Sequence, residues 1–207
     1  MPNRALIVVD MQYDFMPDGA LPVEGGYELV STINELMTHF DLVVATQDWH
    51  PAEHRSFASN HEDQEVGDVV ELEGLDQLLW PDHCVQGTRG AEFVDKLDIE
   101  RIDQVFQKGV DTHYDSYSGF YDNGHKRATG LGTFLREQGV ERVYVAGVAT
   151  DYCVKYTVLD GCRDDFTTYV VLDACRGVAM YPGDIEEAVV EMVEAGAEIC
   201  GARNVGD

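Results

Sequence analysis

The segment 147–157, which reads G-V-A-T-D-Y-C-V-K-Y-T, places Cys153 where a strand is expected to turn sharply into a helix. The apolar run 143–146 predicts a buried parallel strand, and the spacing of apolar residues over 152–163 predicts the helix. A thiol at a helix N-terminus lies beside unpaired backbone N–H groups and the positive end of the helix dipole, which favour the thiolate. The same N–H groups can stabilise the oxyanion that forms when a thiolate attacks a carbonyl. Cys153 is therefore a candidate nucleophile, and the alternative is a cysteine that only fills the core.

Asp10 and Lys108 each come at the end of another predicted strand and could complete such a site. A thiolate mechanism needs a base that takes the thiol proton and a cation that holds the developing charges. The Asp10 carboxylate can accept the Cys153 proton and later donate it to a leaving amine, while the Lys108 ammonium steadies the charges. The simpler alternatives are a turn-forming aspartate and a solvated strand end.

The sequence D-W-H at 48–50 also follows a predicted strand, where alternate side chains point the same way. A carboxylate oxygen and an imidazole nitrogen on one side suit a divalent ion such as zinc, iron or manganese. Two ligands do not make a site, so others are needed, and the candidates are His54, His61 and His83. The spacing differs from that of a zinc finger or an H-E-x-x-H helix, which favours an open, catalytic or substrate-binding metal. The alternative is an exposed loop pair.

The elements that must position these residues alternate between strand-like and helix-like patterns. Strands are predicted at 5–9, 42–46, 101–107, 143–146, 168–172 and 198–200, and helices at 27–40, 129–138, 152–163 and 184–195. Such alternation predicts an α/β fold with a mainly parallel sheet, in which ligands bind beyond the carboxyl ends of the strands. The polar stretch 47–80 shows no periodicity, and loops of this length are usually functional.

The chain has 207 residues, which predicts one domain over 1–207 that buries its core without disulfides. Its formal net charge is −25, with 39 acidic residues against 14 Lys and Arg, which argues against nucleic acid or an anionic membrane as partner. Adaptation to high salt and a merely soluble acidic surface both explain the charge, and melting curves at increasing potassium chloride distinguish them. The five cysteines contain no C-x-x-C, and no transmembrane run or signal peptide is evident, so a cytoplasmic location is expected.

Several motifs occur together and in order along the chain. They are Asp10, D-W-H at 48–50, W-P-D-H-C-V-Q-G-T at 80–88, Lys108-Gly109, Y-S-G-F at 117–120 and G-V-A-T-D-Y-C-V at 147–154. With this combination the chain resembles the isochorismatase-like cysteine hydrolases over essentially its whole length, and within them the nicotinamidases, also called pyrazinamidases. The resemblance implies a three-layer α/β/α sandwich with a mainly parallel six-stranded sheet.

The resemblance also assigns roles to the residues of the triad and of the oxyanion hole. It implies Asp10, Lys108 and Cys153 as the catalytic triad. The backbone N–H groups of Ala149 and Cys153 match the oxyanion hole, beside a cis peptide that the family places between positions 148 and 149.

One divalent metal ion is implied as the cofactor, bound in a loop region at about 47–90. Its protein ligands by resemblance are Asp48, His50 and His83. A fourth ligand varies in the family, and the candidates here are Ser56, His54 and His61. Zinc is the expected ion, with iron and manganese as the alternatives.

The implied reaction is the hydrolysis of nicotinamide to nicotinate and ammonia through a cysteine thioester, as in NAD salvage. Phe15, Trp80 and Tyr117 match the aromatic pocket walls that a flat substrate needs. Position 152, often His in relatives, is Tyr here, which changes the roof of the pocket. The alternative is another amidase of the superfamily that acts on a different small amide. The partner is in either case a small-molecule substrate, and assembly into a homo-oligomer is left open.

Overall fold

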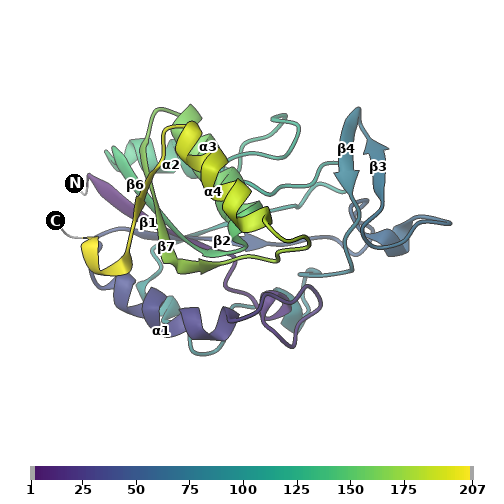
Figure 1. Ribbon diagram of the computed structural model, residues 1–207, viewed down its shortest axis with the longest axis horizontal. Coiled ribbons are helices and arrows are strands. Elements are labelled where there is room, and N and C mark those ends of the chain that lie inside the picture. The colour runs from purple at the N-terminus through teal and green to yellow at the C-terminus, as the bar shows by residue number, and fades with distance from the viewer. Residues whose placement is uncertain (1–2, 206–207) are drawn as a thin grey trace.

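Six parallel strands form the central sheet of the computed structural model, which describes residues 3–205 (Figure 1). In sheet order they are β5 (Gln104–Lys108), β2 (Val43–Asp48), β1 (Arg4–Val9), β6 (Arg142–Val148), β7 (Thr167–Arg176) and β8 (Glu198–Cys200). Neighbouring strands in this order pair in parallel. Helices cover both faces of the sheet, which confirms the expected three-layer sandwich.

Alternate residues of the central strand β1 point to opposite faces and build two hydrophobic cores. On one face, Leu6 and Val8 belong to the core that contains the apolar side of α1 (Gly26–Met37). On the other face, strand residues such as Ile7 pack with α2 (Leu131–Glu137), α3 (Lys155–Arg163) and α4 (Asp184–Glu194).

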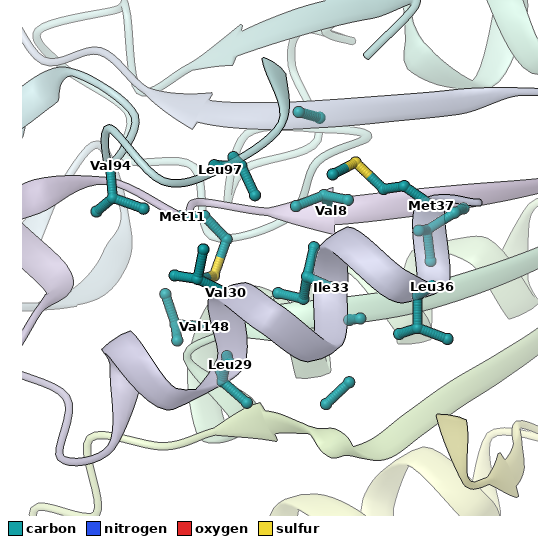
Figure 2. Packing of buried hydrophobic residues seen from close by; sticks show 14 of the residues in the cluster. Val8, Met11, Leu29, Val30, Ile33, Leu36, Met37, Val94, Leu97 and Val148 are labelled. Carbon is teal, nitrogen blue, oxygen red and sulfur yellow. The ribbon is translucent and has the colours of Figure 1, made fainter. Parts of the chain in front are cut away.

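Helix α1 forms because its apolar residues recur three and four positions apart and make one continuous stripe. Figure 2 shows Val30, Ile33 and Met37 directed toward the strand that carries Val8. These side chains are at most 5% exposed, so α1 is fixed against the sheet mainly by apolar burial.

The stretch expected to be a long loop contains a second, antiparallel sheet that the sequence interpretation missed. Strands β3 (Val69–Leu72) and β4 (Leu75–Leu78) form a hairpin around Glu73 and Gly74, whose φ angles are 52° and 83°. Two consecutive positive φ values are what a type I′ turn requires, and this turn matches the twist of a two-stranded ribbon. The hairpin stands apart from the central sheet in Figure 1. The prediction of irregular structure throughout 47–80 was therefore wrong for these residues.

Two strands run further than predicted and carry site residues with them. Strand β2 continues to Asp48 and β5 to Lys108, and these two residues are register partners. The side-chain amide of Gln12 supports the end of β2, because it accepts a hydrogen bond from the Asp48 N–H and donates one to the Asp48 carbonyl, both at 2.8 Å. An aspartate that was expected to follow the strand thus ends it.

The order of the strands reverses at β1, and this reversal decides where a ligand can bind. Strands β2 and β5 lie to one side of β1, whereas β6, β7 and β8 lie to the other. At such a reversal, the connections that follow the two neighbouring strands run to opposite faces of the sheet. They leave a crevice at the carboxyl ends of these strands. Within residues 3–205, none of the helices combines the length and apolar character that crossing a membrane requires.

Candidate active site and metal centre

Cys153 lies in a short turn between β6 and α3, as the strand-to-helix pattern predicted. Strand β6 ends at Val148, the peptide between Val148 and Ala149 is cis, and residues Thr150–Val154 form a π-helical turn before α3 begins at Lys155. The turn puts the Cys153 thiol at the carboxyl edge of the sheet, where it is 6% exposed. The helix itself begins later than the predicted position 152.

Lys108 lies at the centre of a buried cluster that joins the ends of four neighbouring strands. Its Nζ is 2.9 Å from Asp10 Oδ2 and 3.4 Å from Cys153 Sγ. It is also 2.6 Å from Asp48 Oδ1 and donates to the Ser116 carbonyl at 3.0 Å. The structure therefore brings Asp10, Lys108 and Cys153 together.

Burial and the Lys108 charge set the protonation of this cluster. Burial raises the pKa of the Asp10 carboxyl above its ordinary value, although Lys108 opposes the rise. Burial alone would lower the pKa of Lys108, but Asp10 and Asp48 outweigh it and raise that pKa well above the ordinary range. The ammonium therefore stays charged, and Asp10 holds a proton more readily than an exposed aspartate does.

The Cys153 thiol is not favoured as a thiolate at rest, contrary to the expectation from its place before a helix. Burial raises the pKa of Cys153 well above the usual range, and Lys108 opposes this rise. The carboxylates of Asp10 and Asp48 raise it further. Desolvation therefore outweighs the effect of Lys108 on the pKa of Cys153, so the thiol keeps its proton until a base takes it.

Asp48, His50 and His83 form a second buried cluster beside the first, with ligand atoms within 4.8 Å of one another. The Nε2 atoms of His50 and His83 are 3.6 and 3.8 Å from Asp48 Oδ2. The Nδ1 atom of His50 contacts the Gly109 carbonyl at 3.0 Å, and that of His83 contacts the Pro81 carbonyl at 2.7 Å. These backbone carbonyls favour the tautomer in which both Nε2 lone pairs are free for a metal.

The chemistry of this donor set fits a divalent metal ion. Burial and the neighbouring His50 lower the pKa of His83 to about 4, so its imidazole is a neutral donor. Burial also acts to lower the pKa of His50, but Asp48 outweighs it and raises that pKa. Gly109 has a φ of 66°, and a Cβ there would collide with the His50 ring, which accounts for a glycine after Lys108. Two imidazoles and a carboxylate are a donor set that zinc, iron and manganese accept.

Two of the three candidates for a fourth ligand, Ser56 and His54, contact each other, and the third, His61, lies apart from them. The Ser56 hydroxyl contacts His54 Nδ1 at 2.7 Å, so it is already engaged with that ring. The His54 ring is buried with its centroid 4.5 Å from that of His50. His61 Nε2 lies 2.7 Å from the Arg55 carbonyl, outside both clusters. His50, His54 and Asp115 have donor atoms within 4.8 Å of one another.

A pocket opens between the two clusters, and the expected aromatic residues line it. Its walls include Phe15, Trp80, Tyr117, Tyr152, Asp48, His83 and Cys153. The rings of Trp80 and Tyr152 meet nearly at right angles with centroids 4.8 Å apart, and Trp80 Nε1 donates to Tyr117 Oη at 3.1 Å. Tyr152 thus forms part of the aromatic wall of the pocket.

Two buried polar residues near the site, Thr46 and Gln77, escaped the sequence interpretation. The side chain of Thr46 donates to Asp10, that of Gln77 approaches Asp115 Oδ2 at 3.2 Å, and Asp115 itself lines the pocket. Gln77 comes from the unpredicted hairpin. Nothing in a single sequence separates such residues from polar residues at the surface, because their partners lie far along the chain.

Comparisons with known proteins agree with the geometry. Residues 4–204 match the isochorismatase domain family. The nicotinamidase of Escherichia coli is 45% identical over 203 residues, which cover 96% of this chain and 95% of that protein. The solved structure of an Acinetobacter baumanii nicotinamidase and pyrazinamidase superposes with a TM-score of 0.95 at 42% identity and covers 98% of both chains. The pyrazinamidase of Pyrococcus horikoshii, solved in complex with zinc, has a TM-score of 0.79 at 40% identity and covers 97% of this chain and 99% of that chain.

Proposed function

Because this chain belongs to the isochorismatase domain family and is similar to nicotinamidases along nearly its whole length, we propose that it is a metal-dependent nicotinamidase. The reaction is the hydrolysis of nicotinamide to nicotinate and ammonia, a step of NAD salvage. One observation carries the proposal. Lys108 contacts Asp10, Cys153 and Asp48 at once, and so joins a nucleophile, a base and a metal-binding carboxylate in one buried pocket.

In this reaction Asp10 moves the protons and Cys153 forms the covalent bond. Asp10 takes the proton from Sγ, and the thiolate adds to the carboxamide carbon. The backbone N–H groups of Ala149 and Cys153 are proposed to hold the resulting oxyanion. Asp10 gives its proton to the departing nitrogen, so ammonia leaves and a thioester remains.

Water then completes the cycle. Asp10 accepts a proton from a water molecule that adds to the thioester carbon, and it returns this proton to sulfur as nicotinate leaves. Lys108 keeps its charge throughout, since two carboxylates raise its pKa, and it stabilises the carboxylate form of Asp10 between the two steps. The products are one nicotinate and one ammonia for each water consumed.

We propose that Asp48, His50 and His83 hold one divalent metal ion, zinc in preference to iron or manganese. The zinc in the similar Pyrococcus horikoshii pyrazinamidase supports this assignment. When bound, the ion would anchor the ring nitrogen of the substrate, directly or through water. Phe15, Trp80 and Tyr117 would hold the flat ring, so that the carboxamide faces Cys153.

The proposed catalytic and metal-binding residues are distributed along most of the chain, from Asp10 to Cys153. We propose that residues 1–207 act as one hydrolase domain, with the metal held by the region at about 47–90. Ser56 as a fourth ligand, a homo-oligomeric assembly and a cytoplasmic location stay predictions.

The decisive measurement is ammonia release from nicotinamide by the purified protein, before and after chelation and after addition of zinc. We expect release that falls on chelation and returns with the metal. If the metal-loaded protein releases no ammonia from nicotinamide, the substrate assignment fails, and other small amides such as N-carbamoyl compounds become the next candidates. If release is unaffected by complete removal of the metal, the metal assignment fails while the substrate stands.

A further inference from the structure

Asp10 is held in its position at two points by one residue, Thr46, on the neighbouring strand β2. Asp10 directly follows β1 and has a left-handed conformation with a φ of 49°, which is uncommon for a residue with a side chain. Its backbone N–H donates to the Thr46 carbonyl at 3.3 Å, and its Oδ1 accepts a hydrogen bond from Thr46 Oγ1 at 2.7 Å. Both residues are fully buried. Thr46 therefore fixes both the backbone and the carboxylate of Asp10.

The two carboxylate oxygens of Asp10 consequently have different neighbours. Oδ1 accepts from the Thr46 hydroxyl, whereas Oδ2 faces Lys108 Nζ at 2.9 Å, and the same Nζ lies 3.4 Å from Cys153 Sγ. An aspartate carboxylate otherwise rotates over a broad range about its last torsion. The Thr46 hydroxyl removes this freedom and leaves Oδ2 as the oxygen that can exchange a proton with sulfur.

Gly119, in the motif Y-S-G-F, packs against the other branch of Thr46. A Cβ at Gly119 would lie 2.6 Å from Thr46 Cγ2, and its next neighbours, Leu131 Cδ2 and Thr157 Oγ1, would be 3.3 and 3.5 Å away. The φ of Gly119 lies outside the left-handed region, so its conformation does not demand glycine. Space for the Thr46 methyl group explains the glycine instead.

We propose that Thr46 is a positioning residue that selects Oδ2 of Asp10 as the proton-carrying oxygen, and that Gly119 keeps the Thr46 hydroxyl turned toward Asp10. The inference rests on the proposed function, in which Asp10 takes the Cys153 proton. Because Thr46 is branched at Cβ, any side chain at 119 that displaces its methyl group also rotates its hydroxyl away from Asp10.

Thr46→Val tests the hydroxyl, because valine keeps the shape and removes the donor. We expect kcat for nicotinamide to fall by about 10- to 100-fold while KM changes by less than about threefold, since a hydrogen bond to a charged group is lost but no pocket wall moves. Thr46→Ser restores the hydroxyl and should recover most of kcat. The matched control is Thr168→Val, which removes an equally buried hydroxyl that donates to the Phe166 carbonyl at 3.1 Å, away from the site.

The double variant Thr46→Ser with Gly119→Ala tests the link between the two residues. Gly119→Ala alone should lower kcat as Thr46→Val does. In the Thr46→Ser background the methyl group that collides with the new Cβ is gone, so kcat of the double variant should recover to near that of Thr46→Ser alone. Equal loss in both backgrounds would show that Gly119 acts by another route and would overturn this part of the inference.

Two further measurements separate failure of this inference from failure of the proposed function. Bound metal is quantified in each variant, because Asp48 lies two residues from Thr46, and a loss of metal that matches the loss of kcat would overturn the inference. The rate of Cys153 alkylation by iodoacetamide, followed on its own peptide by mass spectrometry, requires no nicotinamide. We expect this rate to fall in Thr46→Val and not in Thr168→Val. An unchanged alkylation rate and an unchanged kcat in Thr46→Val would each refute the role of Thr46.

Discussion

The cluster of Asp10, Lys108 and Cys153 and the cluster of Asp48, His50 and His83 share one edge of the sheet, yet different forces hold them. In the first cluster, a buried ammonium lies 2.9 Å from one carboxylate and is hydrogen-bonded to another. In the second, backbone carbonyls at 2.7 and 3.0 Å fix two imidazole rings. Charge therefore organises the catalytic cluster, whereas contacts with backbone carbonyls orient the imidazole rings of the metal cluster.

Asp48 connects the two clusters because its oxygens face opposite ways. Oδ1 accepts from Lys108 at 2.6 Å, while Oδ2 lies toward the histidine Nε2 atoms. One lysine thus offsets a carboxylate in each cluster. We therefore expect the effect of removing a histidine to be confined to the metal cluster, whereas removal of Lys108 should damage both clusters.

Cys153→Ala should give the largest change in activity. Removal of the nucleophile should lower kcat for ammonia release by about 10⁴-fold or more, as the loss of an attacking group does in other covalent hydrolases. Bound metal should be unchanged, because Cys153 lies in the catalytic cluster. The matched control is Cys162→Ala, a partly buried cysteine on α3 that should retain its activity. Substantial turnover by Cys153→Ala would mean that water attacks the amide directly and that no thioester forms.

Lys108→Met should damage both clusters at once. Methionine fills the space but leaves Asp10 and Asp48 as buried carboxylates without a counter-ion, which should lower the free energy of unfolding by about 3–5 kcal/mol. Activity and bound metal should both fall. Urea denaturation measures the stability, and Arg55→Ala is the control. Its pair with Glu73 is about 40% exposed on both sides, so its loss should change stability by less than about 1 kcal/mol. Metal affinity that survives intact in Lys108→Met would contradict the coupling through Asp48.

His83→Asn should confine its effect to the metal cluster. Removal of one of three protein ligands should weaken metal binding by at least about 10- to 100-fold and raise KM for nicotinamide. Cys153 should be alkylated at the same rate as in the wild-type protein, because the substitution leaves the catalytic cluster unchanged. His61→Asn is the control, since His61 Nε2 contacts the Arg55 carbonyl, outside both clusters. Slower alkylation in His83→Asn would show that the two clusters are less separate than their geometry indicates.

The sequence predicted the parts of the fold that depend on apolar periodicity. The strand 5–9 and the stripe of α1 were predicted closely, because their apolar residues are buried and leave a clear pattern in the sequence. The hairpin β3–β4 was missed because its side chains are largely exposed and its turn places Glu73 at positive φ, where Asn, Asp or Gly is the usual signal. A ribbon that packs little apolar surface leaves little pattern to detect.

The site residues also divide into those that a sequence pattern indicates and those that it does not. Asp10, Lys108 and Cys153 could be found because parallel strands bring their carboxyl ends to one edge. Thr46 could not be found, because its partner lies 36 residues away and a buried threonine looks the same in a sequence as an exposed one. The protonation of Cys153 was also misjudged, because a sequence shows the start of a helix but not the desolvation around it.

The pH dependence of kcat/KM gives the smallest but most direct test of the difference between the clusters. Burial raises the pKa of Asp10 above the ordinary value of 3.8, so Asp10 keeps its proton to a higher pH than an exposed aspartate. A protonated Asp10 cannot accept the Cys153 proton, and activity should therefore fall as the pH decreases through this raised pKa. The acidic limb of the profile should thus lie above the range of an ordinary aspartate. Bound metal is quantified at each pH, because Asp48 raises the pKa of His50, and protonation of this ligand is the other route by which activity can fall in acid. Loss of metal in step with activity would assign the limb to the metal cluster and remove Asp10 as the titrating base.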